Sequence, residues 1–216
     1  EFEYRGWSGV KDLPELNREQ IKAARVIGNP GCYPTSVQLG LAPLLRAGLI
    51  EPTGIIANCA SGVSGAGRKA EVHTLMAEAS DNFKAYGVKG HRHGPEINQQ
   101  LRTIAGRDDV DCLFVPHLLP TSRGLLVTAH VRLVQSLDQS DLDDLFRQRY
   151  EGEPFVQLGG VPAPQRLAGS NVCWINGWVD ERTGTILIAA ALDNLVKGAA
   201  GQAIDRKSTR LNSSHV

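Results

Sequence analysis

Cys32 has the sequence setting that most favours covalent chemistry in this chain. It lies within residues 28–36 (GNPGCYPTS), between the end of an expected strand and the start of an expected helix. Pro34 suits the first turn of a helix, which places the thiol at or beside the helix N-terminus. Unpaired backbone N–H groups and the positive end of the helix dipole favour a thiolate there. The pattern indicates a nucleophilic cysteine, with a packed turn residue as the alternative.

His91 and His93 form the second group that could do chemistry. They lie two residues apart in the segment 90–97 (GHRHGPEI), just ahead of an expected helix. The pair could transfer protons, bind a metal or simply cap the helix. A metal site needs a third ligand, and the nearby candidates Glu96 and His73 have no recognisable ligand spacing. We therefore expect no metal, and the residues alone leave proton transfer and capping open.

The other three cysteines are expected to be structural. Cys59, Cys112 and Cys173 each lie in an apolar stretch, and no Cys-x-x-Cys pair occurs. A zinc ribbon or a redox pair therefore has no support. Cysteine in such a setting behaves as a small buried hydrophobic residue, so we expect these thiols to be buried and reduced.

Apolar periodicity and turn residues predict the elements that must position these groups. Helices are expected over 18–23, 35–46, 95–104, 138–150 and from 193 to 204. Strands are expected over 24–27, 54–60, 112–117, 125–134, 171–179 and 185–192, with a loop at 61–67. Several strands follow one another without an intervening helix. This order predicts an α+β fold with a largely antiparallel sheet and flanking helices.

Composition excludes several classes of protein. The 216 residues are 42% hydrophobic and 21% charged, which is typical of a chain with a packed core. The formal net charge is zero and the basic residues are scattered, so we expect neither a nucleic-acid nor a membrane partner. Apolar runs are far shorter than the roughly 20 residues of a membrane span. Without a signal-peptide pattern, we expect a soluble, cytoplasmic protein.

Six motifs together resemble one family, the N-acetyl-γ-glutamyl-phosphate reductases of arginine biosynthesis. The resemblance covers about residues 12–204 and keeps the family order of the motifs. The motifs are 13–17 (LPELN), 29–35 (NPGCYPT), 61–68 (SGVSGAGR), 91–97 (HRHGPEI), 116–124 (PHLLPTSRG) and 193–198 (DNLVKG).

The resemblance implies a two-domain enzyme with an N-terminal NADP-binding domain. No complete Gly-x-Gly-x-x-Gly unit between a strand and a helix occurs in this chain. We therefore expect residues 1–204 to be the catalytic and dimerisation domain, incomplete at both ends, of a protein that is a homo-oligomer at full length. Residues 205–216 resemble a translated sequencing adapter and are expected to be a non-native tail. The chain by itself is expected to be inactive as a reductase.

The resemblance also implies a mechanism with a small-molecule substrate. The thiolate of Cys32 attacks an acyl phosphate, phosphate leaves, and NADPH delivers hydride to the resulting thioester. His91 activates the thiol and exchanges protons with the oxygen of the intermediate. Three residues are candidates for binding substrate: Arg68, Arg92 and His93. Four residues are candidates for the cofactor side: Ser61, Gly62, Gly65 and Asn194.

Three other functions fit parts of the pattern. A relative from the lysine pathway would share the acyl-phosphate chemistry, and the motifs separate it poorly from the arginine enzyme. A cysteine–histidine hydrolase would need no cofactor, but it requires a third residue that orients His91. A non-catalytic domain that only mediates dimerisation through its sheet would have an unreactive Cys32.

Overall fold

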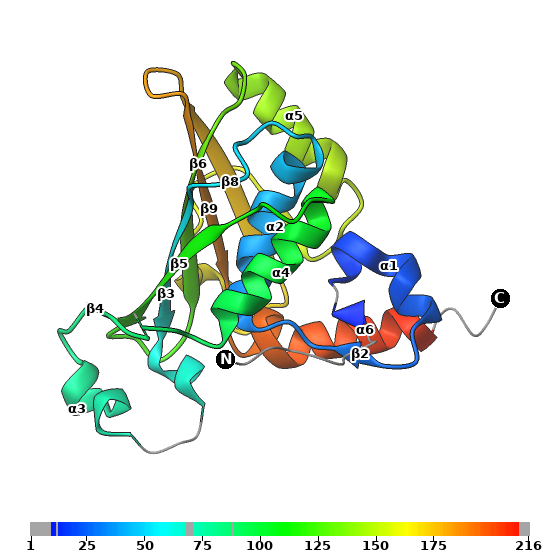
Figure 1. The fold of residues 1–216 in the computed structure, drawn as a ribbon. Helices are drawn as coiled ribbons and strands as arrows, with labels where there is room; N and C mark the ends of the chain where they lie inside the picture. Colours follow the sequence, from blue (N-terminus) through cyan, green and yellow to red (C-terminus); the bar gives the residue numbers. More distant parts are fainter. Residues whose placement is uncertain (1–9, 12, 68–70, 88, 212–216) are drawn as a thin grey trace.

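A computed structural model describes residues 10–11, 13–67, 71–87 and 89–211 (Figure 1). Its helices are α1 (Pro14–Ala23), α2 (Cys32–Arg46), α3 (Met76–Ala79), α4 (His93–Ala105), α5 (Gln139–Tyr150) and α6 (Gly201–Leu211). Its strands are β1 (Val10–Lys11), β2 (Ile27–Gly28), β3 (Ile55–Gly62), β4 (Lys84–Ala85), β5 (Cys112–Leu119), β6 (Leu125–Arg132), β7 (Val156–Leu158), β8 (Cys173–Asp180) and β9 (Thr185–Leu192). Short 3-10 turns form η1 (Val63–Ala66), η2 (Val72–Thr74) and η3 (Pro164–Leu167), and η4 (Val196–Ala200) is a π-helical turn.

The main sheet is mixed. Its strand order is β4-β5-β3-β6-β9-β8-β7, while β1 and β2 pair separately. Within the described part of the chain, four of its six pairings are antiparallel, and β3–β5 and β7–β8 are parallel. The expected α+β class with a largely antiparallel sheet is confirmed. Strands β5 and β6 are joined by a short connection, yet β3 lies between them, which the sequence did not indicate.

One face of this sheet is covered by helices. Figure 1 shows α2, α4 and α5 on the same side, with α2 nearest the centre. Every residue of α2 except Cys32 and Arg46 is buried. A helix that is apolar on most sides can be stable only between two layers, and the sheet and the outer helices provide them. No helix in the described residues is both long and apolar enough to span a lipid bilayer.

The opposite face of the sheet has no helix over it in the described residues, and we call it the open face (Figure 1). The pairing register aligns a row of side chains across five strands of this face: Leu113, Ile56, His130, Leu187 and Trp178. Leu113 is 62% exposed and Ile56 is 37% exposed. Within the described ranges one end of this face is covered: Leu167 of η3 packs on Trp174 and Ala191, and Phe83 stacks on His117.

The chain after β9 differs from the expected single helix over 193–204. The π-helical turn η4 comes first, and α6 then continues through Leu211. Residues 205–211 contain neither proline nor glycine, so nothing in them ends the helix. Arg206 donates to the carbonyl of Gly28, and Arg18 of α1 donates to Thr209 at 3.4 Å. The segment set apart as a tail is therefore helical up to residue 211. Its adapter origin stays a prediction.

The packing of α5 on the sheet can be tested by substitution of Leu142. The side chain is 1% exposed and packs beside Gly177 of β8. We expect Leu142→Ala to lower the free energy of unfolding by about 2–4 kcal/mol, because the neighbouring groups fill such a cavity only in part. Val26 is 55% exposed, so Val26→Ala is the matched control and should change stability by less than about 0.5 kcal/mol. Urea unfolding measures both, and equal effects would contradict this packing.

Candidate active site

Cys32 is the first residue of α2, which starts three residues before the expected helix over 35–46, and its thiol lies at the helix N-terminus as expected. Gly31 precedes the helix in an extended conformation, and its carbonyl accepts hydrogen bonds from the N–H and hydroxyl of Thr35, both at 2.9 Å. Cys32 is partly buried against the core, whereas Cys59, Cys112 and Cys173 are buried. The expected burial of these three thiols is confirmed, and all four cysteines are unpaired.

The thiol of Cys32 is less acidic than its helix position suggests. Burial raises the pKa of Cys32 to about 11. The backbone N–H groups of Cys32 and Tyr33 and the charge of Arg92 act in the opposite direction, but burial outweighs them. Burial also raises the pKa of Cys112 and Cys173 to about 12. The local pattern predicted a thiolate stabilised by the helix start, whereas burial in the surrounding core favours the neutral thiol. The pKa of Cys32 is still lower than the pKa values of Cys112 and Cys173.

The two histidines lie against the start of α2. A Cβ atom on Gly31 would lie 2.3 Å from Nε2 of His93, so only glycine fits beside this ring. The Gly31 N–H donates to Oε1 of Glu96 at 3.0 Å. The ring of Tyr33 meets the rings of His91 and His93 edge-on, with centroids 6.0 and 5.9 Å apart. The structure therefore brings together the cysteine and histidine segments, and these neighbouring contacts join them.

His91 is held in one orientation by the backbone. Its Nδ1 accepts a hydrogen bond from the N–H of His93 at 3.1 Å. Neutral imidazole has one N–H, so this bond assigns the proton of neutral His91 to Nε2. Burial and the nearby Arg92 both lower the pKa of His91. His91 is therefore a neutral ring whose Nε2 is a hydrogen-bond donor.

His93 is the more buried of the two, at 8% exposure. Burial, the neighbouring His91 and Arg92 lower its pKa to about 3, so the ring stays neutral near pH 7. Its Nδ1 atom is buried and has no hydrogen-bond partner among the described residues. Arg92 itself is exposed at the start of α4. No cluster of three His, Cys, Asp or Glu side chains that could hold a metal occurs in the ranges described.

An aromatic cluster that the sequence did not indicate supports His91. The hydroxyls of Tyr33 and Tyr86 are 3.1 Å apart, and Tyr33 also donates to the carbonyl of His117 at 3.4 Å. The ring of Phe114 meets those of Tyr33 and His91 at 5.2 and 5.4 Å. Tyr86 and Phe114 follow no motif in the sequence. Only the pairing of β5 beside β3 brings Phe114 to this point.

The four residues expected on the cofactor side lie together at the end of β3 and β9. Ser61 is buried and donates to the carbonyl of Gly62 at 3.1 Å. A Cβ atom on Gly65 would lie 2.6 Å from the Ser61 hydroxyl oxygen, and one on Gly62 would lie 2.7 Å from the carbonyl of Thr121. These glycines therefore allow close packing of two loops.

Asn194 joins the same two loops. Its Oδ1 accepts from the N–H of Gly124 at 2.8 Å, and its Nδ2 donates to the hydroxyl of Ser64 at 3.0 Å. Farther along the same segment, a Cβ atom on Gly198 would lie 2.5 Å from Cβ of Cys32. The chain from Asn194 to Gly198 thus connects the expected cofactor loop to the thiol. Arg68, a candidate for binding substrate, lies outside the described residues.

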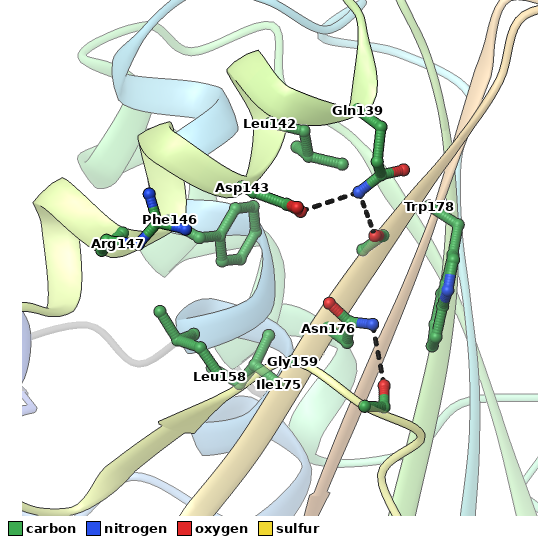
Figure 2. Close-up of a pocket in the computed structure, with 12 residues that line it drawn as sticks. Gln139, Leu142, Asp143, Phe146, Arg147, Leu158, Gly159, Ile175, Asn176 and Trp178 are labelled. Carbon is green, nitrogen blue, oxygen red and sulfur yellow. Dashed lines mark hydrogen bonds between the residues drawn. The ribbon is translucent and has the colours of Figure 1, made fainter.

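A pocket of about 500 Å³ lies elsewhere, between α5 and β8 (Figure 2). Gln139 fills part of its wall by donating to the carbonyl of Gly177 and accepting from the N–H of Val179, both at 3.0 Å. Asn176 donates to the carbonyl of Gly160 at 2.7 Å. Gln139 thus pairs with the outer edge of β8, while Asn176 of β8 bonds the loop after β7. None of the candidate site residues lines this pocket, so we assign it no part in the chemistry.

Sequence relatives support the resemblance seen in the motifs. An N-acetyl-gamma-glutamyl-phosphate reductase of Laribacter hongkongensis is 53% identical over 198 residues, and one of Geobacter metallireducens is 53% identical over 199. One of Desulfotalea psychrophila is 51% identical over 199 residues. Each match covers 90% of this chain, and the chain spans 57% of the length of each relative.

Solved structures share the fold at low sequence identity. Aspartate semialdehyde dehydrogenase II of Vibrio cholerae superposes with a TM-score of 0.75 at 19% identity, covering 94% of this chain and 68% of that one. The aspartate semialdehyde dehydrogenase of Francisella tularensis gives 0.71 at 15% identity, covering 98% and 72%. The family model described as semialdehyde dehydrogenase, dimerisation domain, matches residues 32–194. The chain therefore belongs to the semialdehyde dehydrogenase dimerisation-domain family.

Proposed function

We propose that this chain is the nucleophile-bearing part of an N-acetyl-γ-glutamyl-phosphate reductase, acting in the cytoplasm in arginine biosynthesis. The observation that carries the proposal is the position of Cys32, which starts α2 beside Gly198 and between Gly31 and Tyr33, the two residues that contact the histidine segment. Relatives that are 53% identical over the aligned residues carry that name, whereas the lysine-pathway alternative rests on shared chemistry alone.

The first step is acyl transfer to the thiol. As the thiol proton passes to Nε2 of His91 in its other tautomer, the Cys32 sulfur attacks the acyl carbon, a C–S bond forms, and the C–O bond to phosphate breaks with the electron pair leaving on phosphate. The backbone N–H groups of Cys32 and Tyr33 at the start of α2 have no partner within the helix, so they can stabilise the negative charge on the carbonyl oxygen. The product is a thioester on Cys32.

His91 then acts on oxygen. Nδ1 of His91 accepts from the His93 N–H, so the proton on Nε2 can be donated to the oxygen of the thiohemiacetal that forms when the thioester is reduced. Accepting the thiol proton needs the other tautomer, which breaks the bond to His93. The same bond argues against a hydrolase triad, because a backbone amide rather than a carboxylate orients the ring.

Arg92 and His93 are proposed to contact the substrate. Arg92 is exposed beside the thiol, and a guanidinium pairs with phosphate or carboxylate in bidentate fashion. His93 is buried with an unpartnered Nδ1, so this nitrogen can donate or accept one hydrogen bond while the ring stays uncharged. Arg68 remains a further candidate on the motif alone.

This chemistry needs a nicotinamide that supplies hydride when bound, and the resemblance implies NADPH rather than NADH. The loop of Ser61, Gly62 and Gly65 would lie against it together with Asn194. Of the two Nδ2 protons of Asn194, one is used by Ser64 among the described contacts, which leaves the other for the carboxamide of the nicotinamide. The Gly124 N–H that bonds Oδ1 holds the amide in this orientation.

Two copies of the chain are proposed to pack through the open face. An uncovered sheet face with leucine and isoleucine at its centre is costly in water, and a second copy would cover it symmetrically. The name of the family agrees with this role.

Acylation tests the nucleophile without the cofactor. We expect the 216-residue chain to release about one equivalent of phosphate from N-acetylglutamyl phosphate and to gain one acyl group, found by peptide mapping at Cys32. Cys32→Ser should abolish this, and Cys173→Ser, at a buried thiol, should not. No NADPH oxidation is expected from this chain alone, because its described sheet contains no dinucleotide-binding unit. Acylation of another residue, or NADPH turnover, would contradict the proposal.

The pH dependence of alkylation tests the environment of the thiol. Because burial raises the pKa of Cys32 to about 11, its thiolate fraction should rise with pH. The rate of iodoacetamide labelling should increase about tenfold per unit from about pH 7 to about pH 9.5, without a plateau. Arg92 lowers this pKa, so Arg92→Ala should slow labelling about two- to fivefold, whereas Arg107→Ala, an exposed arginine paired with Asp109, should not. A plateau below about pH 8 would mean an activated thiol.

Sedimentation velocity tests the open face. We expect the chain to form dimers at micromolar concentration and Leu113→Arg to sediment as a monomer, since a charge would be buried at the interface. Val26→Arg places the same charge at another exposed apolar position, on the loop between α1 and β2, and should leave the dimer intact. A dimer that survives Leu113→Arg would place the interface elsewhere.

A further inference from the structure

We infer that Glu15 and Lys197 are positioning residues: their buried ion pair holds η4 against Cys32. The inference rests on the proposed function in one respect, because it takes Cys32 as the reacting thiol. It gives a physical role to two motifs, residues 13–17 and 193–198, for which the mechanism uses only Asn194.

The pair is fully enclosed by the fold. Lys197 is 0% exposed and Glu15 is 2% exposed, and Nζ of Lys197 bonds Oε1 of Glu15 across 182 residues of sequence. The ammonium also lies over the ring of Phe155, 5.4 Å from its centroid. Two buried charges add little stability compared with two apolar side chains, but each keeps the other in place because neither can remain unpaired. Such a pair therefore fixes the distance between α1 and η4.

Residues adjacent to Lys197 contact the nucleophile. A Cβ atom on Gly198 would lie 2.5 Å from Cβ and 3.1 Å from Cα of Cys32, so the two backbones are in direct contact. The carbonyl of Ala199 accepts from Nδ2 of Asn29 at 3.2 Å. A π-helical turn is an uncommon geometry that often marks functional sites, and here it places Lys197 toward α1 and Gly198 toward the thiol.

The front of the same segment is held independently. Asp193 is fully buried, and its Oδ1 accepts from the N–H groups of Leu195 and Val196 at 2.8 and 3.1 Å. Its Oδ2 accepts from Gly169 at 2.7 Å and from Arg123 at 3.3 Å. Asp193 thus anchors the end that carries Asn194, and the pair of Lys197 and Glu15 anchors the end that carries Gly198.

Helix α1 is itself attached to α5, which supplies a control. Arg149 donates to the carbonyl of Glu15, and Arg18 pairs with Glu153 at 2.7 Å. Glu153→Gln weakens the attachment of α1 without touching η4. It separates loss of the specific pair from general loosening of α1.

The test is the pH profile of iodoacetamide labelling at Cys32 in the double variant Glu15→Leu/Lys197→Met. This variant leaves no unpaired buried charge, so it should keep its far-UV circular dichroism. If η4 moves away, the thiol becomes less buried, its pKa falls, and labelling near pH 8 should rise at least about fivefold, with the profile displaced to lower pH. Glu153→Gln should keep the profile of the unaltered chain. A double variant that folds and keeps that profile overturns the inference.

Hydrogen exchange on the unaltered chain tests the same point without a variant. Peptides over 14–23 and 193–200 should become exchangeable together, as one cooperative unit. Exchange of 193–200 that is independent of α1 overturns the inference, also where the double variant does not fold. The proposed function can fail independently of this inference. If N-acetylglutamyl phosphate does not acylate Cys32 but the labelling profile of the double variant still shifts, the positioning role stands. If acylation occurs and the profile does not shift, only the positioning role falls.

Discussion

The burial of α2 along almost its whole length is the constraint on which the site depends. Because Cys32 is the first residue of that helix, its thiol lies where the core ends and the loops begin. The helix start offers unpaired N–H groups to an anion, while the surrounding apolar atoms penalise one. Burial is the larger effect, and it raises the pKa of the resting thiol to about 11. The positive charge of Arg92 acts against this penalty without overcoming it.

Two segments distant in sequence, 91–93 and 196–200, close around this helix start, and glycines or backbone groups allow the close approach. Gly31 gives room for His93, Gly198 gives room for Cys32, and the His93 N–H orients His91. A larger side chain at Gly31 or Gly198 would collide with these neighbours. Close backbone contacts therefore hold the site more than side-chain pairs do. The buried ion pair of Glu15 and Lys197 is proposed to hold η4 in addition.

The two faces of the sheet have different roles. The covered face carries α2 and places Cys32, whereas on the open face η3 packs at one end and Phe83 stacks on His117. β3 pairs with β5 in parallel and with β6 in antiparallel, so the end of β3 lies beside the end of β5 and the start of β6. The end of β3 leads into the loop of Ser61. Its neighbour β5 contributes Phe114, and the residue just before β6 is Gly124.

The sequence by itself determined the local features: the helix that starts at Cys32, the strands near 55–62, 112–119, 125–132 and 185–192, and the buried state of three cysteines. Periodicity and turn chemistry act over a few residues, so these could be predicted, and the motifs indicated the family. Only the tertiary structure decided the placement of β3 between β5 and β6, the aromatic support from Tyr86 and Phe114, and the pairing of Glu15 with Lys197. It also reversed the expected acidity of Cys32. Desolvation depends on every atom packed around a group, whatever its distance along the chain, and no local pattern contains that information.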